Sequence, residues 1–142
     1  GFVHRRLMGE NIIPILPVAL NTYFPPNQPT PRRCYALGAA IGEAVAAWDS
    51  DRRVGILASG GLSHFAVNEE LDRKVIEACR AKDHDLLKSL PHNEISSGSS
   101  EIRNWIAVAG AVPHLDVTWS EYVPCYRSEA GTGVGMGFVV WS

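Results

Sequence analysis

Short apolar runs alternate along this chain with segments whose apolar residues recur at helical spacing, and this alternation limits the folds open to it. From Pro31 to about Trp48, apolar residues fall on one face at steps of three and four, which predicts a helix. The run "VGILAS", residues 54–59, is short and apolar, so we expect a buried strand there. The whole pattern predicts an α/β fold, with a mixed sheet flanked by helices, formed by residues 1–142 as a single module.

Residues with strong local preferences mark the ends of the other elements. Thr30 and Asn68 are good helix N-caps. Pro14 and Pro17 remove backbone donors from the apolar run 11–20, so that run should be an edge strand or irregular. The remaining expectations are helices at 69–81, 83–90 and 101–111, the last capped by Ser99 or Ser100, a strand at 114–123, and a glycine-rich turn at 131–137 before a last strand.

Charge and cysteine content argue against several classes of protein. The net charge is -2 with acids and bases interspersed, which gives no support to nucleic acid or a membrane surface as partner. No apolar run approaches the roughly 20 residues that span a bilayer, and no signal peptide is visible. Cys34, Cys79 and Cys125 are widely spaced, which argues against a disulfide framework and a cysteine zinc site. We expect Cys34 and Cys79 in the core and a cytoplasmic protein.

The stretch "ASGGLSHF", residues 58–65, places a histidine just behind two glycines and after the expected strand. Glycines leave the backbone bare and conformationally free, and histidine is the side chain that most often exchanges protons near neutral pH. If 54–59 were a central strand, His64 would lie beyond its carboxyl end, where α/β proteins bind ligands. Taken alone, the pattern fits a catalytic histidine and a plain turn histidine equally well. Ser63 lacks the spacing of a nucleophile elbow.

Glu101 falls in the first turn of an expected helix, where two interpretations are open. One is a surface acid favoured by the helix dipole, and the other is a metal-ligating carboxylate. The other histidines form no metal-binding signature; these are His4, His84, His92 and His114. The glycines of "GTGVGMG" lead into a strand rather than a helix, which excludes a dinucleotide fingerprint.

Taken in order, five stretches resemble the C-terminal half of class III extradiol dioxygenases, the group that holds the catalytic subunits of protocatechuate and gallate meta-cleavage enzymes. They are "NTYFPPNQPTPRRCYALG", "ILASGGLSHF", "NEELDRKVIEA", "EIRNWIAVAGA" and "GTGVGMGF". The resemblance implies a non-haem Fe(II) enzyme that opens catechol-type rings with O₂. It also implies that Glu101 is an iron ligand and that His64 is the acid and base.

The resemblance also indicates what this chain lacks. The two iron-binding histidines of the family lie in an N-terminal half that this chain does not contain, and His4 does not match their context. The resemblance therefore implies that the missing half is supplied by the same or another chain, and it suggests a small accessory subunit and a homo-oligomer. The expected substrate pocket consists of Gly60, Gly61, Ser63, Phe65 and Tyr23, with Phe65 at a position where many relatives carry a polar residue.

Two other functions remain open on the sequence alone. The chain could be a non-catalytic binding or scaffold member of the same superfamily that kept the fold and lost the metal. It could also be a metal-dependent hydrolase built on a similar sheet.

Overall fold

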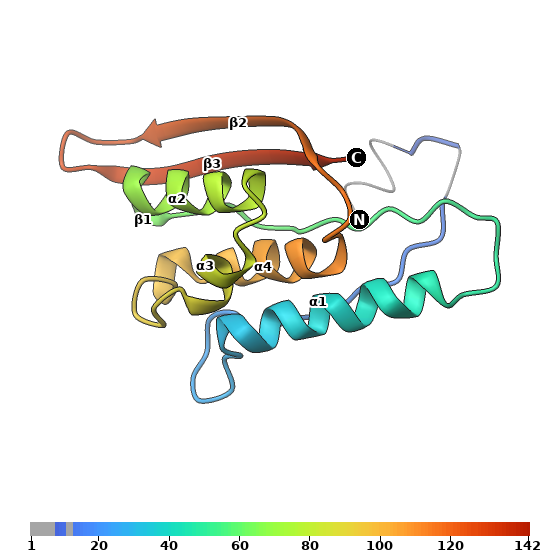
Figure 1. The fold of residues 1–142 in the computed structure, drawn as a ribbon. Coiled ribbons are helices and arrows are strands. Elements are labelled where there is room, and N and C mark those ends of the chain that lie inside the picture. The colour runs from blue at the N-terminus through green and yellow to red at the C-terminus, as the bar shows by residue number, and fades with distance from the viewer. Residues whose placement is uncertain (1–7, 11–12) are drawn as a thin grey trace.

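A computed structural model of the chain describes residues 8–10 and 13–142. Its elements follow one another as α1 (Pro31–Ala46), β1 (His64–Ala66), α2 (Glu69–Arg80), α3 (His84–Ser89), a 3-10 turn η2 (Ser97–Ser99), α4 (Ile102–Ala111), β2 (Val117–Tyr126) and β3 (Thr132–Trp141). In Figure 1 the β2–β3 hairpin lies along the top, α1 lies along the bottom, and α4 runs between them. Mixed helix and strand content is therefore confirmed.

The described strands form one antiparallel sheet in the order β1-β3-β2. β3 pairs with β2 over nearly its full length and with β1 at His64, which lies opposite Val134. The glycines expected as a turn before the last strand lie almost entirely inside β3, because only Gly131 belongs to the hairpin turn. Side chains at Gly133, Gly135 and Gly137 would collide with the Cys125 carbonyl, Asp72 and Leu62, so these glycines let the neighbouring segments approach β3 closely.

Two of the expected helix starts are confirmed by their caps. The Thr30 side chain accepts the Arg33 N–H at 3.2 Å, and the Asn68 side chain accepts the Leu71 N–H at 3.1 Å. The helix expected at 101–111 is present as α4, but its expected cap is wrong, because Glu101 rather than Ser99 or Ser100 holds the N-cap position.

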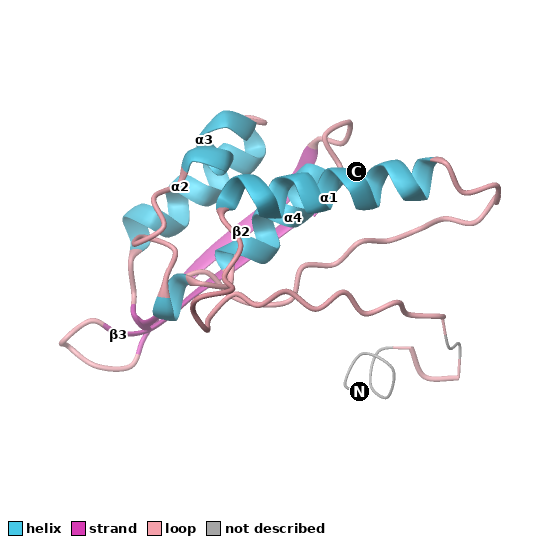
Figure 2. Cartoon of the chain, turned by 90° about the horizontal axis from the view of Figure 1, so that it is seen from below, coloured by secondary structure: helices cyan, strands magenta, loops and turns pink. Residues whose placement is uncertain are grey.

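The expected strand at 54–59 is also wrong. The segment forms no strand in the described part of the chain, and Leu57 is 84% exposed. Residues 13–20 likewise belong to no strand, in keeping with Pro14 and Pro17, while residues 11 and 12 lie outside the described residues. Figure 2 shows these segments as long loops before and after α1. His64 consequently does not follow a central strand but opens the short strand β1.

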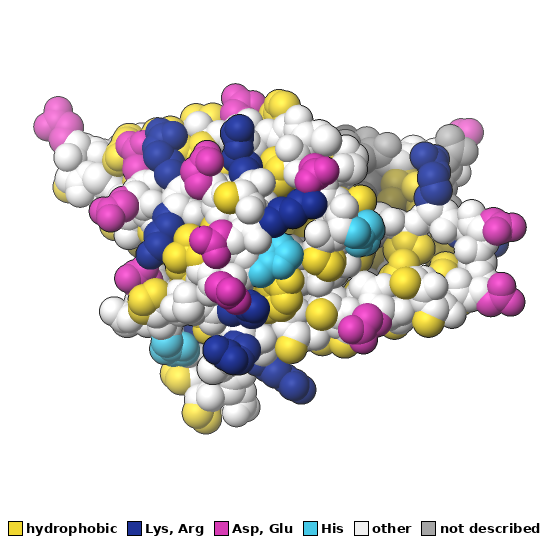
Figure 3. Space-filling model, in the orientation of Figure 1, with side chains coloured by type: hydrophobic (Ala, Val, Ile, Leu, Met, Phe, Trp, Pro, Cys, Tyr) yellow, Lys and Arg dark blue, Asp and Glu magenta, His cyan; other side chains and the backbone are white. Residues whose placement is uncertain are grey.

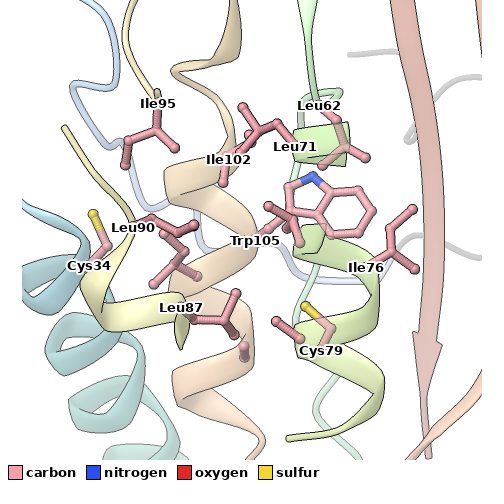
Figure 4. Packing of buried hydrophobic residues seen from close by; sticks show 14 residues of the cluster. Cys34, Leu62, Leu71, Ile76, Cys79, Leu87, Leu90, Ile95, Ile102 and Trp105 are labelled. Carbon is pink, nitrogen blue, oxygen red and sulfur yellow. The ribbon is translucent and has the colours of Figure 1, made fainter. Parts of the chain in front are cut away.

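The core fills the space between the helices and the inner face of the sheet. Trp105 of α4 lies beside Leu62 and Leu71 in this cluster (Figure 4). Cys34 and Cys79 are buried in it, as expected, and burial raises the pKa of their thiols to about 11 and about 12. Over the face seen in Figure 3, charged side chains of both signs are interspersed. None of the described helices combines the length and apolarity needed to cross a bilayer.

Helices α1 and α4 pack so closely that glycines are required at their contact. A Cβ atom at Gly38 would collide with the Ala107 carbonyl oxygen, and one at Gly42 would collide with the Ala111 carbonyl oxygen. Gly110 of α4 faces the Tyr35 backbone in the same way. Backbone atoms cannot turn aside as a flexible side chain can, so the spacing of the two helices is fixed here.

We therefore expect Gly38→Ala to destabilise the protein. Alanine favours a helix over glycine by about 1 kcal/mol, but overpacking against backbone costs about 1 to 3 kcal/mol beyond that gain. Chemical denaturation of the variant measures this loss. Gly55→Ala is the matched control, because a Cβ there meets nothing within 4 Å and its stability should stay within about 0.5 kcal/mol of wild type. Equal stability of both variants would contradict the tight α1–α4 contact.

Candidate active site

The loop that precedes β1 meets the N-terminal end of α4 at two glycines. Gly60 has a φ of 125°, which residues with a Cβ rarely adopt. A Cβ atom at Gly60 would lie 2.8 Å from the Glu101 side chain, and the Gly61 N–H donates to Glu101 Oε2 at 3.1 Å. The bare backbone therefore passes directly against the Glu101 carboxylate.

His64 faces the same carboxylate from β1. Its Nδ1 lies 2.9 Å from the Gly98 carbonyl oxygen. Because a carbonyl oxygen can only accept, Nδ1 carries the hydrogen in this contact. The other ring nitrogen, Nε2, lies 3.6 Å from Glu101 Oε2. The structure thus brings together the two side chains that the sequence singled out, and a Cβ at Gly61 would lie 3.0 Å from the His64 ring.

The Glu101 side chain does not bind the backbone of its own helix, α4. It occupies the N-cap position of α4, but its side chain makes no capping hydrogen bond. Its carboxylate points to Gly61 and His64 and keeps 42% of its side-chain surface exposed. A half-exposed carboxylate beside an imidazole can bind a cation or take part in proton exchange.

An apolar hollow of about 910 Å³ opens beside this pair. Its lining comes mainly from segment 54–58, α4 and β3, and it includes Gly60, Gly61 and His64. Among the described residues that line it, no side chain is that of Asp, Glu, Lys or Arg. The hollow therefore suits an apolar group better than a charged one.

The other expected pocket residues lie away from the lining of this hollow. Ser63 is fully buried, and its hydroxyl donates to Asp72 at 2.6 Å. Phe65 is 67% exposed, with an unusual φ of 69°, and Tyr23 is half-exposed in the proline-rich loop before α1. Their part in substrate binding stays a prediction.

Asp72, which the sequence analysis did not single out, is a fully buried carboxylate that binds Ser63, the residue before His64. It accepts hydrogen bonds from the Ser63 N–H, the Ser63 hydroxyl and the Tyr122 hydroxyl. Burial raises the pKa of Asp72, and the donated hydrogen bonds offset part of that rise. The sequence held a signal, because Asp72 lies on the apolar face of α2 with Val75, Ile76 and Cys79.

Arg103, also not anticipated, is a fully buried cation that joins three segments. Its guanidinium donates to the carbonyl oxygens of Pro29 at 2.9 Å, Thr22 at 3.2 Å and Ile95. It also lies 3.1 Å from His92 Nδ1. Burial lowers its pKa. Arg103 thus ties the proline-rich loop and the loop before η2 to α4, next to Glu101.

The remaining histidines are dispersed. His84 Nδ1 lies 2.6 Å from the Tyr35 hydroxyl, His92 contacts Arg103, and His114 lines the hollow. His4 lies outside the described residues. Within the described part of the chain, no three His, Cys, Asp or Glu side chains come together as a metal site.

Comparison with known proteins identifies the class. Residues 5–137 match the family described as the catalytic LigB subunit of aromatic ring-opening dioxygenase. The match covers most of the chain, so the protein belongs to this family. A curated relative is gallate dioxygenase of Pseudomonas putida, 50% identical over 36 residues, which are 25% of this chain and 11% of that enzyme. The matched segment is therefore only a small part of that relative.

Arg103 offers a test of the scaffold around Glu101. We expect Arg103→Lys to lower the free energy of unfolding by at least about 2 kcal/mol, because each buried carbonyl left without a donor costs about 1 to 3 kcal/mol and one ammonium cannot reach them all. Denaturant titration measures the loss. The control is Arg80→Lys, because Arg80 is exposed and a change there should be near neutral. An Arg103→Lys variant as stable as this control would contradict the role given to the guanidinium.

Proposed function

We propose that this protein belongs to the catalytic machinery of a non-haem Fe(II)-dependent extradiol dioxygenase that opens catechol-type rings with O₂. In this proposal Glu101 is an iron ligand and His64 is the acid and base. The observation that carries it is the 3.6 Å approach of His64 Nε2 and Glu101 Oε2 beside an apolar hollow, in a chain of an aromatic ring-opening family.

The candidate ligand among the described residues is of a type that binds ferrous iron, but one ligand is too few to hold the metal. Fe(II) oxygenases hold their metal with two histidines and one carboxylate, which leave positions open for substrate and oxygen. Glu101 supplies a partly exposed carboxylate of the right type. The described residues bring no pair of histidines to it. As the family resemblance implies, the proposal takes the two histidine ligands from outside this chain.

His64 is suited to move a proton. Its Nδ1 is committed to the Gly98 carbonyl, so the ring is held and Nε2 is the nitrogen left to face a ligand. A catechol must lose hydroxyl protons when it binds a metal, and one must be returned later in ring cleavage. A positioned imidazole within hydrogen-bond reach can do both. Iron, when bound, would hold the substrate hydroxyls and O₂ side by side.

The remaining parts of the proposal concern substrate, partners and place. The glycines beside His64 leave room for a flat ring, and the hollow favours an aromatic compound.

Apolar side chains around the hollow, such as Leu57 and Phe138, are exposed, which suits packing against the N-terminal half of the catalytic domain, in the same or another chain. We place the fold as the C-terminal part of the class III extradiol dioxygenase fold. A small accessory subunit, a homo-oligomer and a role in aromatic catabolism are expected from the family.

We also place the protein in the cytoplasm. All three cysteines are unpaired, and reduced thiols are typical of that compartment.

The proposal is tested on the full-length gene product, loaded anaerobically with Fe(II). Glu101→Ala should lose most of its iron, because one of three protein ligands is gone, whereas His64→Ala should keep its iron and lose turnover by about 100-fold or more. Iron content is measured by elemental analysis, and turnover by the yellow colour of the ring-opened product from a catechol.

Matched variants separate chemistry from packing. Glu101→Gln keeps the shape of the side chain but removes its charge, so it should also bind iron weakly. Glu129 is exposed in the turn between β2 and β3, so Glu129→Gln should leave iron binding and turnover unchanged. Full turnover in His64→Ala, or normal iron content in Glu101→Ala, would refute the assigned roles.

A further inference from the structure

Asp72 is the one fully buried carboxylate of the described chain, and the chemistry proposed above does not use it. It is offered three hydrogen-bond donors: the Ser63 N–H at 2.9 Å on Oδ1, and the Ser63 hydroxyl at 2.6 Å and the Tyr122 hydroxyl at 2.7 Å on Oδ2. No Lys or Arg forms an ion pair with it among the described residues. Two of its three hydrogen bonds therefore go to a single residue, the one before His64.

Ser63 is held on every side by this arrangement. Its hydroxyl accepts the Asn68 N–H at 2.9 Å while it donates to Asp72, and its carbonyl oxygen accepts the Gly135 N–H at 2.8 Å. Each polar group of Ser63 thus has a partner, and the residue is fully buried. A residue fixed at its N–H, hydroxyl and carbonyl has little freedom to rotate.

Gly135 shows how closely the carboxylate is built into the sheet. A Cβ atom at this position would collide with Asp72 Oδ2 and would lie 2.9 Å from the Ser63 hydroxyl oxygen. The Asp72 carboxylate thus occupies the space that a side chain at Gly135 would need, so that α2, β2, β3 and the residue before β1 meet at this carboxylate.

The next residue along the chain is His64, whose ring must meet two partners at once. Nδ1 lies 2.9 Å from the Gly98 oxygen while Nε2 faces Glu101 at 3.6 Å. The backbone then turns at Phe65 with a φ of 69°, a conformation that costs free energy and persists only where its surroundings hold it. Phe65 lies only two residues after Ser63.

We propose that Asp72 is a positioning residue, which acts through Ser63 to hold the His64 imidazole between Gly98 and Glu101. The proposal rests on the function proposed above for His64. A shift of about 1 Å at a reacting group can cost about 100-fold in rate, so fixing Ser63 matters for proton transfer. Asp72 itself touches neither the hollow nor the reacting atoms.

The test compares variants that break or keep the hydrogen bonds to Ser63. Asp72→Ala removes them. Asp72→Asn keeps a hydrogen bond at each contact but reverses two of them, because its oxygen still accepts the Ser63 N–H while its amide donates to the two hydroxyl oxygens. Tyr122→Phe is the matched control, since it removes one hydrogen bond to Asp72 without touching Ser63.

The first measurement is an ¹⁵N NMR spectrum of the histidine rings in the metal-free, full-length gene product, with His64→Gln to assign the Nδ1–H signal. The signal should be present in wild type, Asp72→Asn and Tyr122→Phe, and lost or clearly shifted in Asp72→Ala. A folded Asp72→Ala protein with the wild-type signal would overturn the proposal. If Asp72→Ala does not fold, Ser63→Gly takes its place, and an unchanged His64 signal there would overturn the proposal equally.

The second measurement is ring cleavage by the Fe(II)-loaded protein. Asp72→Ala should lower kcat about 10- to 100-fold with KM within about threefold, while Asp72→Asn and Tyr122→Phe stay within about threefold of wild type in kcat. An equal loss in Tyr122→Phe would contradict an action through Ser63. If the wild-type protein opens no catechol, the proposed function fails, whereas the NMR comparison still decides whether Asp72 positions His64.

Discussion

The hydrogen bond from the Gly61 N–H to the Glu101 carboxylate joins the two halves of this structure. On one side, α4 is set by its tight contact with α1 at Gly38 and Gly110. On the other, the loop before β1 is held to β3, where the Leu62 N–H donates to the Gly135 carbonyl. Two further hydrogen bonds hold the same loop to α4, from the Asn104 side chain to the Ser59 carbonyl at 2.7 Å and from the Trp105 indole N–H to the Gly60 carbonyl at 3.2 Å. Together these contacts fix where Glu101 and His64 lie relative to each other. The two glycines are needed because any side chain at Gly60 would occupy the space of the carboxylate.

Two buried charges support this junction, and neither forms an ion pair in the described structure. Asp72 is satisfied by N–H and O–H donors, and Arg103 by carbonyl oxygens. Burying a charge without an opposite charge is costly, and it is tolerated only when every polar atom finds a partner. Apolar side chains at positions 72 and 103 would fill the same volume at a lower desolvation cost, but they could not form the hydrogen bonds that hold the loops on either side of Glu101. The polar choice therefore favours a defined geometry over stability.

The helices of this fold could be predicted from sequence because their signals are local. Thr30 and Asn68 cap the helices that they were expected to cap, and Cys34 and Cys79 lie on the buried faces that their spacing indicated. That segment 54–59 forms no strand could not be predicted, because an apolar run shows only that a segment would be stable when buried, not what would bury it. The glycines of β3 misled for a related reason. Their role is to make room for Asp72 and Leu62, and such contacts between distant segments leave no pattern within a short window.

The same difference between local signals and long-range contacts applies to the candidate site. His64 and Glu101 stood out by residue type and position, but their approach depends on Gly60, Gly61 and Gly98, which come from different parts of the chain. The sequence pattern places Asp72 as a charged residue on the apolar face of α2, but no short-range pattern indicates its hydrogen bond with Ser63. Residue chemistry is visible in the sequence, whereas the partner of each residue is a property of the fold.

The apolar hollow and the incomplete ligand set have one explanation under the proposed function. Segment 54–58 is strand-like in sequence and exposed in the structure, and it lines the hollow beside His64 together with the exposed faces of Trp119 and Phe138. A patch of large apolar side chains of this kind is typical of a surface that another polypeptide covers. A polypeptide that delivers two histidines to Glu101 must approach from the accessible side of the carboxylate, next to the glycines that line the hollow. The segment that completes the metal site would then also bury the apolar surface, so that folding and iron binding would depend on the same contact.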